Sequence, residues 1–192
     1  MDNPSRSDLT RARLVDAAIA ILADRGYRGL TFVEICRRCD LSRGAIHHHY
    51  ASLTDLLVDV VREIGSRIAR GIETMEGGNL PPEELYSLGI DFVWRQLHTA
   101  DFAALVQIRT AIPTSPELKE RVRDEVRRIH EDWYVQADKL ATARRASVDP
   151  GVTRIILSAL TGASLIDAAI GEPSSDPDRE QFRSTLKTLV LR

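Results

Sequence analysis

The sequence has few aromatic residues, few cysteines and no long apolar run, and each shortage narrows the class of protein. Aromatic side chains make up 5% of the 192 residues, although hydrophobic ones make up 43%. This balance favours helices over strands, which are enriched in aromatic and β-branched residues. No stretch approaches the roughly 18 to 20 consecutive apolar residues that cross a membrane, and the N-terminus lacks the apolar core of a signal peptide. We therefore expect a cytoplasmic protein without a membrane partner.

The chain holds two cysteines, Cys36 and Cys39, spaced C-x-x-C and followed by three consecutive histidines. A structural zinc site needs four ligands that converge on one ion, whereas consecutive residues of a helix point about 100° apart. The pattern favours two reduced cysteines that fill a core over a zinc or redox site, so we predict no metal and no cofactor. The motifs of nucleophilic and metal-dependent enzymes are also missing, and we predict that the protein is not an enzyme.

The net charge of −2 is small for a protein that coats nucleic acid, but the charge is unevenly distributed. Residues 1–50 carry eight basic and six acidic side chains, a net charge of +2, and the remainder carries −4. A weakly basic head on an acidic body fits a protein that touches DNA at one end only.

Residues 31–50, TFVEICRRCDLSRGAIHHHY, predict two short helices joined by a tight turn. Thr31 and Glu34 have the spacing of a capping box, in which each side chain satisfies a free amide at the start of the first helix. Asp40 interrupts the helical pattern, and Ser42 can cap a second helix. The inward-facing side chains would be those of Ile35, Ile46 and Tyr50.

The outward face of the second helix carries small and hydrogen-bonding side chains, as a helix needs in order to enter the major groove of DNA. Arg43 could bond to guanine N7 and O6, and Ala45 could pack against a thymine methyl group. Helix N-termini, such as those at the two capping residues, favour phosphate oxygens. The alternative is a solvated helix end that binds nothing. The predicted DNA contacts are Thr31, Ser42, Arg43, Gly44, Ala45, His47 and His48.

Residues 9–57 resemble the N-terminal domain of the TetR family of bacterial transcriptional regulators. The resemblance consists of an alanine-rich first helix, a Gly-aromatic turn, a Thr-capped second helix and a third helix of the form S-x-G-x-hydrophobic-Tyr-x-His-Phe. It implies an all-α fold, a phosphate contact at His49, and a second domain in which a bound small molecule shifts two DNA heads out of register. The matching residues here are Ala17, Ala18, Gly26, Tyr27, Thr31, Ser42, Gly44, Ile46, His49 and Tyr50.

Three residues depart from the family pattern. His47 stands where the family usually has Tyr, and Leu53 stands where it usually has Lys. The usual residues touch DNA phosphates, so the backbone contacts of this chain would be rearranged or weaker. Asp40 replaces a turn glycine, at a position where Asp can still reach the left-handed conformation at some cost.

Helical periodicity continues through the rest of the chain. We predict a first helix over residues 9–24 that Gly26 ends, a long helix that Ser52 caps, and another long helix that starts at Ser115. Between residues 75 and 82, MEGGNLPP predicts a loop. The expected fold is all-α with about nine helices, divided into a helix-turn-helix DNA-binding domain, 1–52, and a helical ligand-binding and dimerisation domain, 53–192.

Two sets of residues are candidates for the function of the second domain. Aromatic walls with a few polar groups are typical of ligand pockets, although each such residue could equally be ordinary core or surface. Small side chains let two helices approach closely, with packing inside one chain as the alternative to a dimer. The pocket candidates are Trp94, His98, Phe102, Gln107, Arg109, Trp133 and Tyr134. The dimer candidates are Ala159, Gly162, Ala163, Phe182, Leu186 and Leu189.

Arg109 lies within an apolar helix and should therefore have a carboxylate partner, which could be Asp101, Glu131 or an acidic ligand. We expect a homodimeric repressor that reads a pseudo-palindromic operator in double-stranded DNA and leaves it when an unidentified small-molecule effector binds. Two alternatives stay open. One is a regulator that activates or that ignores ligands, and the other is an all-helical interaction protein without DNA function.

Overall fold

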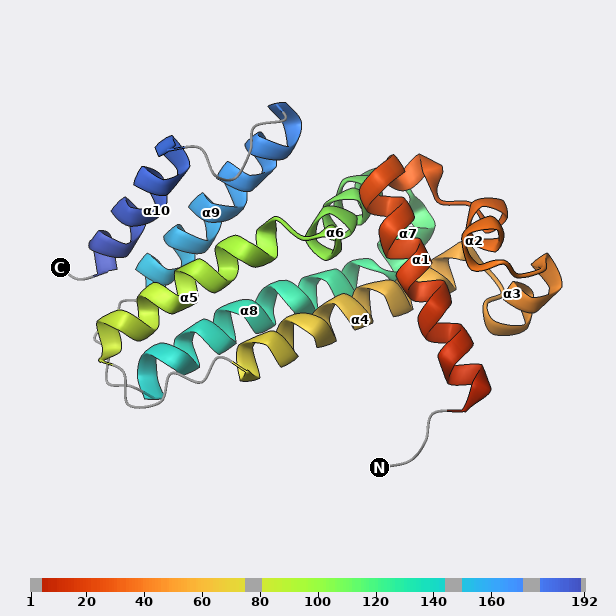
Figure 1. Ribbon diagram of the computed structural model, residues 1–192, viewed down its shortest axis with the longest axis horizontal. Coiled ribbons are helices and arrows are strands. Elements are labelled where there is room, and N and C mark those ends of the chain that lie inside the picture. Colours follow the sequence, from red (N-terminus) through yellow and green to blue (C-terminus); the bar gives the residue numbers. More distant parts are fainter. Residues whose placement is uncertain (1–4, 75–80, 144–149, 171–176, 191–192) are drawn as a thin grey trace. The chain divides into compact units, whose positions relative to one another are not determined.

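The computed structural model describes residues 5–74, 81–143, 150–170 and 177–190 (Figure 1). These ranges contain ten α-helices, one short 3-10 helix and no strand, which confirms the all-α prediction. None of the helices so described is long and apolar enough to cross a membrane. The elements are α1 Arg6–Gly29, α2 Phe32–Cys39, α3 Arg43–His49, α4 Leu53–Glu73, α5 Pro82–Leu97, α6 Ala100–Ala111, η1 Ile112–Thr114, α7 Pro116–Arg121, α8 Arg123–Ala143, α9 Pro150–Ile170 and α10 Pro177–Val190.

The described ranges contain one α-helix more than the nine or so expected, because the long helix predicted from Ser115 is in fact two. Helix α7 ends at Arg121 and α8 begins at Arg123. Val122 between them has φ −111° and ψ −30°, and its side chain is fully buried. The apolar spacing does not register this break, because the buried stripe continues across it through Leu118, Val122, Val126 and Ile129.

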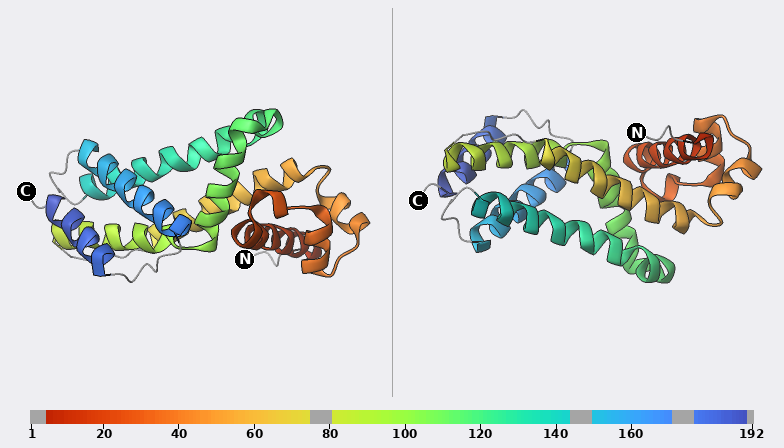
Figure 2. Two further views of the ribbon diagram at one scale, coloured as in Figure 1. Left: turned by 90° about the horizontal axis from the view of Figure 1, so that it is seen from above. Right: turned by 90° about the horizontal axis from the view of Figure 1, so that it is seen from below.

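The chain divides into two compact units. The first unit consists of residues 1–70 and 100–129, and the second of residues 71–99 and 130–192. Helices α4 and α8 each pass from one unit into the other (Figure 2). The division into a DNA-binding domain of residues 1–52 and a second domain of residues 53–192 remains a prediction.

The core of the first unit forms where the apolar faces of α1, α4 and α6 are buried. The apolar residues of α4 that lie three and four positions apart, from Leu56 to Ile68, are buried because this spacing places them on one face of the helix. Arg67 of α4 adds a polar link, since its guanidinium pairs with Asp16 of α1, with Glu63 at 2.9 Å and with Asp101 of α6 at 3.1 Å. Asp101, one of the partners considered for Arg109, is therefore paired with a different arginine.

Helix α1 begins at a capping box in which Ser5 accepts the amide of Asp8 and Asp8 accepts the amide of Ser5. Gly26, which we predicted to end this helix, only interrupts it, with φ 69° and ψ −179°, and one further helical turn reaches Gly29. The side-chain Oε1 of Gln107 on α6 accepts the Tyr27 amide at 3.3 Å. A Cβ atom at Gly26 would lie 2.9 Å from this oxygen. Both the positive φ and the close approach of α6 therefore require glycine here.

The second unit packs α5, α9 and α10 around a small apolar core that includes Trp94, Leu97 and Leu160. Polar groups join the three helices. Ser164 of α9 donates to the carbonyl of Leu97 at 2.8 Å, and Arg179 of α10 pairs with the buried Asp167 of α9 at 2.5 Å.

Apolar spacing alone does not identify the buried face of α5. Leu88 lies three residues after the buried Leu85 and four before the buried Phe92, yet it is 42% exposed, whereas Ile90 and Trp94 are buried.

Candidate nucleic-acid interface

The first helix of the motif starts at Thr31, whose hydroxyl accepts the Glu34 amide at 3.2 Å. The prediction of a reciprocal capping box is wrong in its second half. The Glu34 carboxylate pairs instead with Arg37 at 2.6 Å and with Arg25 of α1 at 3.1 Å. These arginines lower the pKa of Glu34, the hydrogen bond from Arg37 contributing most. Glu34 thus joins α2 to α1.

The turn between α2 and α3 depends on Asp40, which has φ 51° and ψ 51°. This left-handed conformation confirms that Asp can take the position of the usual turn glycine. It allows the Leu41 amide to donate to the carbonyl of Cys36 at 3.1 Å and so closes the last turn of α2.

Helix α3 presents its polar face outward, as predicted. Ser42 caps it by accepting the Ala45 amide at 3.2 Å. Ile46 and Tyr50 are buried at 0% and 2% exposure and hold the helix on the core. On the opposite side Arg43, Gly44, His47 and His48 are exposed, and Ala45 and His49 are half-exposed.

The end of α3 is anchored by Tyr50, whose hydroxyl donates to Asp59 of α4 at 2.8 Å. Arg11 of α1 pairs with the same carboxylate at 2.6 Å and lies over the Tyr50 ring. Burial and the neighbouring carboxylate raise the pKa of Tyr50 well above its ordinary value. The carboxylate of Asp59 therefore links the end of α3 to both α1 and α4.

The two cysteines are free thiols. Cys39 lies in the core as expected, and burial raises the pKa of its thiol. Its carbonyl accepts a hydrogen bond from Arg13 of α1 at 2.8 Å. Cys36 is half-buried. No cluster of three or more His, Cys, Asp or Glu residues suited to a metal ion occurs in the ranges that the structure describes.

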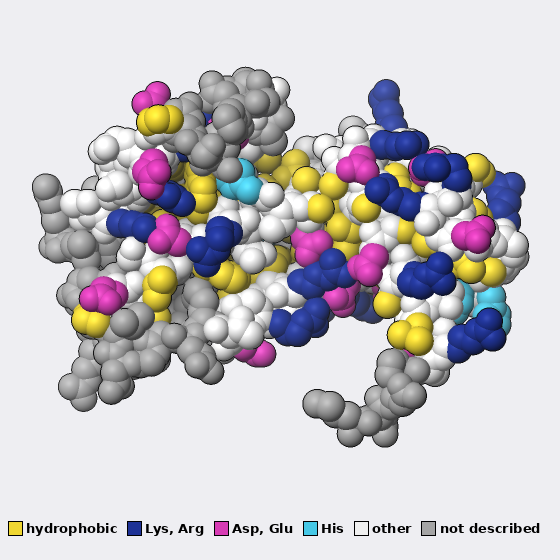
Figure 3. All heavy atoms as spheres, in the orientation of Figure 1, with side chains coloured by type: hydrophobic (Ala, Val, Ile, Leu, Met, Phe, Trp, Pro, Cys, Tyr) yellow, Lys and Arg dark blue, Asp and Glu magenta, His cyan; other side chains and the backbone are white. Residues whose placement is uncertain are grey.

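Arginines surround the motif, but most of them are already paired. Arg25 and Arg37 share Glu34, and Arg38 pairs with Asp24 at 3.1 Å. Within the described ranges, Arg43 alone among the arginines of α2 and α3 has no ion-pair partner. Basic and histidine side chains lie together on the surface over α2 and α3 (Figure 3). The unpaired guanidinium of the motif therefore lies at the start of α3.

The seven predicted pocket residues are divided between the two units. Phe102, Gln107 and Arg109 belong to the first unit, and Trp94, His98, Trp133 and Tyr134 belong to the second. In the second unit, the ring centroids of Trp94 and His98 lie 4.5 Å apart. Gln107 is already engaged with the Tyr27 amide. A pocket formed by these residues stays a prediction.

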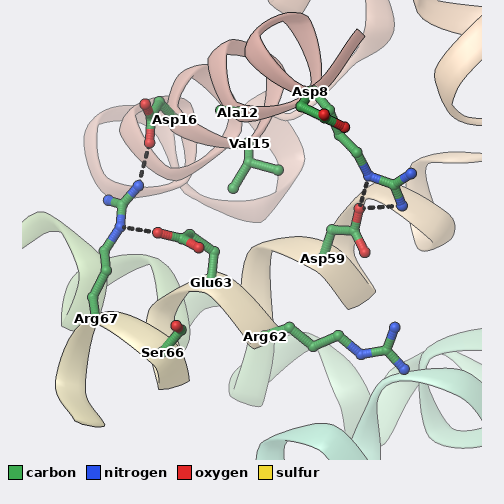
Figure 4. Close-up of a pocket in the computed structure, with 10 residues that line it drawn as sticks. Asp8, Ala12, Val15, Asp16, Asp59, Arg62, Glu63, Ser66 and Arg67 are labelled. Atoms are coloured by element: carbon green, nitrogen blue, oxygen red, sulfur yellow. Dashed lines mark hydrogen bonds and ion pairs between the residues drawn. The ribbon is translucent and has the colours of Figure 1, made fainter. Parts of the chain in front are cut away.

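A cleft of about 550 Å³ lies between α1 and α4 in the first unit (Figure 4). None of the predicted pocket residues lines it. Its walls are mostly charged, and the charges pair across it, as Arg11 does with Asp59 and Arg67 with Asp16. The cleft is therefore a polar seam between two helices of the first unit.

The predicted dimer residues differ in exposure. Ala163 and Leu186 are buried inside the second unit, whereas Ala159, Gly162 and Phe182 are half-exposed. The side chain of Leu189 lies outside the described residues. Beside Gly162, where a Cβ atom would meet nothing within 4 Å, the exposed face of α9 carries three large apolar side chains that the search for small residues missed. They are Ile155 at 65%, Leu165 at 40% and Ile166 at 55% exposure.

A capped helix, a left-handed turn and a second capped helix with a polar outward face define a helix-turn-helix DNA-binding protein of the all-α class. A sequence model described as "Bacterial regulatory proteins, tetR family" matches residues 14–60. The N-terminal part of the chain therefore belongs to the TetR family of transcriptional regulators.

Sequence and structure comparisons find similar proteins that match between 40% and 96% of this chain. The HTH-type transcriptional regulator BetI of Brucella canis is 23% identical over 141 residues, which are 72% of this chain and 71% of BetI. The regulator UidR of Escherichia coli K12 is 32% identical over 79 residues, 40% of each chain. A crystal structure of a transcriptional regulator from Saccharomonospora viridis, in complex with choline, has the same fold. Its TM-score is 0.76 at 19% identity, with 96% of both chains covered.

Proposed function

We propose that this protein is a homodimeric repressor that binds a pseudo-palindromic operator through α3 and releases it when a small molecule binds the second unit. The observation that carries the proposal is the outward face of α3. There Arg43, without an ion-pair partner in the described part of the chain, stands beside Gly44 and the half-exposed Ala45. A guanidinium next to small side chains can approach base edges closely and bond to guanine.

A second copy of the chain is the partner we infer for α9 and α10. The outward face of α9 carries no charged side chain from Ile155 through Gly162 to Ile166. Exposed charges on α10 are confined to its first turn, at Asp178 and Glu180. The exposed residues beyond it that the structure describes are uncharged: Gln181, Ser184, Thr185 and Thr188. In a chain with 28% charged residues, an uncharged exposed face with a small residue at its centre suits close packing of helices about a two-fold axis.

A homodimer would present two copies of α3 to half-sites about 34–36 Å apart, one turn of DNA. The effector would be a small organic molecule; the structure of the Saccharomonospora viridis protein holds one, choline. It would weaken operator binding only to the extent that it prefers the conformation that does not fit DNA. We place this activity in the cytoplasm, where the DNA is.

The experiment that tests the proposal is selection of bound duplexes from a random DNA pool, with wild type beside Arg43→Ala. We expect a pseudo-palindrome for wild type. Arg43→Ala should bind it about 5- to 150-fold more weakly, equivalent to ~1–3 kcal/mol, and lose preference at one base pair per half-site. Arg128→Ala is the matched control, because it removes an equal charge from α8, where Arg128 pairs with Glu125 at 2.9 Å. It should select the same sequence as wild type.

Failure to select any motif at low salt, with and without candidate effectors, would refute the repressor and leave an interaction protein without DNA function. Selection of a motif that no effector displaces would instead point to a ligand-independent regulator. Choline is the first effector to test, by the shift it causes in the melting temperature and in operator affinity.

A further inference from the structure

The exposed face of the reading helix makes one ring contact with the start of α2. The rings of Phe32 and His47 meet edge to face, with centroids 4.9 Å apart and planes inclined at 64°. Phe32 is the first residue of α2 and is half-buried, whereas His47 is exposed in the middle of α3. The contact therefore joins a side chain of the DNA-facing surface to a fixed part of the fold.

No hydrogen bond or ion pair involves the His47 ring nitrogens within the described ranges. Phe32 is thus the neighbour that restricts its orientation. An exposed histidine without such a neighbour changes rotamer freely, and ordering it on binding costs about 0.5–1.5 kcal/mol. An aromatic pair of this geometry stabilises one orientation by a similar amount, about 0.5–1.5 kcal/mol.

The neighbourhood of the ring points to a phosphate rather than a base. Phe32 directly follows Thr31, which caps α2, so His47 contacts a side chain of the helical turn that has free backbone amides. Such amides attract anions, and an imidazole N–H can donate to the same phosphate oxygens. The contact with Phe32 keeps the imidazole on the side of α3 that faces α2.

We propose that Phe32 is a positioning residue for DNA recognition, which holds His47 so that its ring N–H donates to a backbone phosphate. The proposal rests on the proposed function, because it requires that α3 lies on DNA. Phe32 itself touches no DNA. Its effect on affinity passes through the imidazole and must disappear when the imidazole is removed.

A double-mutant cycle on the selected operator tests this. The variants are Phe32→Leu, which keeps apolar bulk without the ring, His47→Ala, and the two combined. We expect Phe32→Leu to weaken binding about 2- to 10-fold and His47→Ala to weaken it at least as much. The combined variant should bind no more weakly than His47→Ala. Phe32→Tyr, which keeps the ring, should restore wild-type affinity.

The salt dependence of binding provides a readout that a merely structural role would not move. Loss of one contact that neutralises a phosphate charge reduces the slope of log affinity against log salt concentration by about 0.9. The titrations are therefore made at about pH 5.5, where an ordinary imidazole is mostly protonated. Both Phe32→Leu and His47→Ala should show this reduction. Phe92→Leu is the matched control, since Phe92 is a buried ring of the second unit and its loss should leave the slope unchanged. The melting temperature of each variant verifies folding.

Additive losses from Phe32→Leu and His47→Ala, or an unchanged salt slope in Phe32→Leu, would overturn the positioning role while leaving the protein a DNA-binding regulator. Absence of operator binding by wild type would instead overturn the proposed function. The two failures are therefore distinguished in one series of titrations.

Discussion

At the scale of single residues, Asp40 holds the least favourable backbone conformation of the reading head. In the described ranges it is the one residue other than glycine with positive φ. An L side chain in this region costs about 1–2 kcal/mol, less for Asp and Asn, whereas glycine adopts it freely but loses more chain entropy on folding. We predict that Asp40→Gly stabilises the protein by about 0.5–1 kcal/mol and raises its melting temperature by a few degrees. Asp40→Ala should lower it, and a lower melting temperature for Asp40→Gly would contradict the assignment of strain.

Tyr50 supplies a second prediction at this scale, with a defined dependence on pH. Its hydroxyl donates to Asp59 at 2.8 Å, so Tyr50→Phe should lower the free energy of unfolding by about 1–2 kcal/mol at neutral pH. Burial, assisted by Asp59, raises the pKa of Tyr50 above the ordinary 10.0. The folded protein therefore keeps a proton that the unfolded chain releases. Stability from this group is complete below pH 10.0 and falls as the pH rises.

Urea unfolding from about pH 9 to about pH 11 checks this sign, since the titration of an ordinary tyrosine is centred near 10. The stability of wild type should fall more steeply across this range than that of Tyr50→Phe. Equal slopes for the two proteins would show that the hydroxyl is not held in its neutral form.

At the scale of elements, a buried ion pair joins α9 to α10. Asp167 is 3% exposed, and Arg179 Nη2 lies 2.5 Å from its Oδ1. Removing one partner of such a pair leaves a buried charge uncompensated. We predict that Arg179→Met lowers the free energy of unfolding by about 3 kcal/mol, measured by urea denaturation.

The same substitution at Arg183, one turn further along α10, is the matched control. Arg183 pairs with Glu180 at 3.2 Å and with Asp91 at 3.8 Å, and it lies over the Trp94 ring. Neither carboxylate is buried as Asp167 is, and a solvent-accessible pair contributes about 0–1 kcal/mol. Arg183→Met should therefore cost much less than Arg179→Met. Similar losses for both variants would mean that the burial of Asp167 does not govern the junction.

At the scale of the whole molecule, the exposed face of α9 governs assembly if the protein is a dimer as proposed. Ile155→Glu and Ile166→Glu would place carboxylates against their symmetry mates, without solvent to screen them. We predict that either variant halves the mass measured by sedimentation equilibrium and greatly weakens binding to the full palindrome. Leu88→Glu, an equal change at an exposed leucine of α5, should leave the mass unchanged. A monomeric wild type would refute the assembly itself.

Local features of the head could be predicted because their causes lie within a few residues. The hydroxyls of Thr31 and Ser42 cap the helices that follow them, and Ile46 and Tyr50 are buried because four residues return a helix to the same face. The outward residues of α3 follow from the same periodicity. Their contacts with DNA remain predictions, since burial alone does not identify a partner.

The second unit was harder to predict because its helices have broad apolar surfaces. Small residues suggested where helices approach, but Ala163 and Leu186 are buried within the unit, while Ile155 and Ile166 are exposed. The spacing of apolar residues distinguishes the two faces of a helix, but it does not show which face packs against the rest of the chain. Leu88 is an example, since it has the helical spacing of the buried Leu85 and Phe92 but is exposed.

By itself, the sequence determined the all-α class, the caps and turn of the reading head, and the polar side of α3, because these depend on short-range geometry. Only the tertiary structure decided which partner each charged group takes. Glu34 pairs with Arg25 instead of closing a capping box, and Asp101 pairs with Arg67. The reason is physical: a carboxylate has nearly equal affinity for many arginines, and only the packing of helices distant in sequence brings one of them within hydrogen-bonding reach.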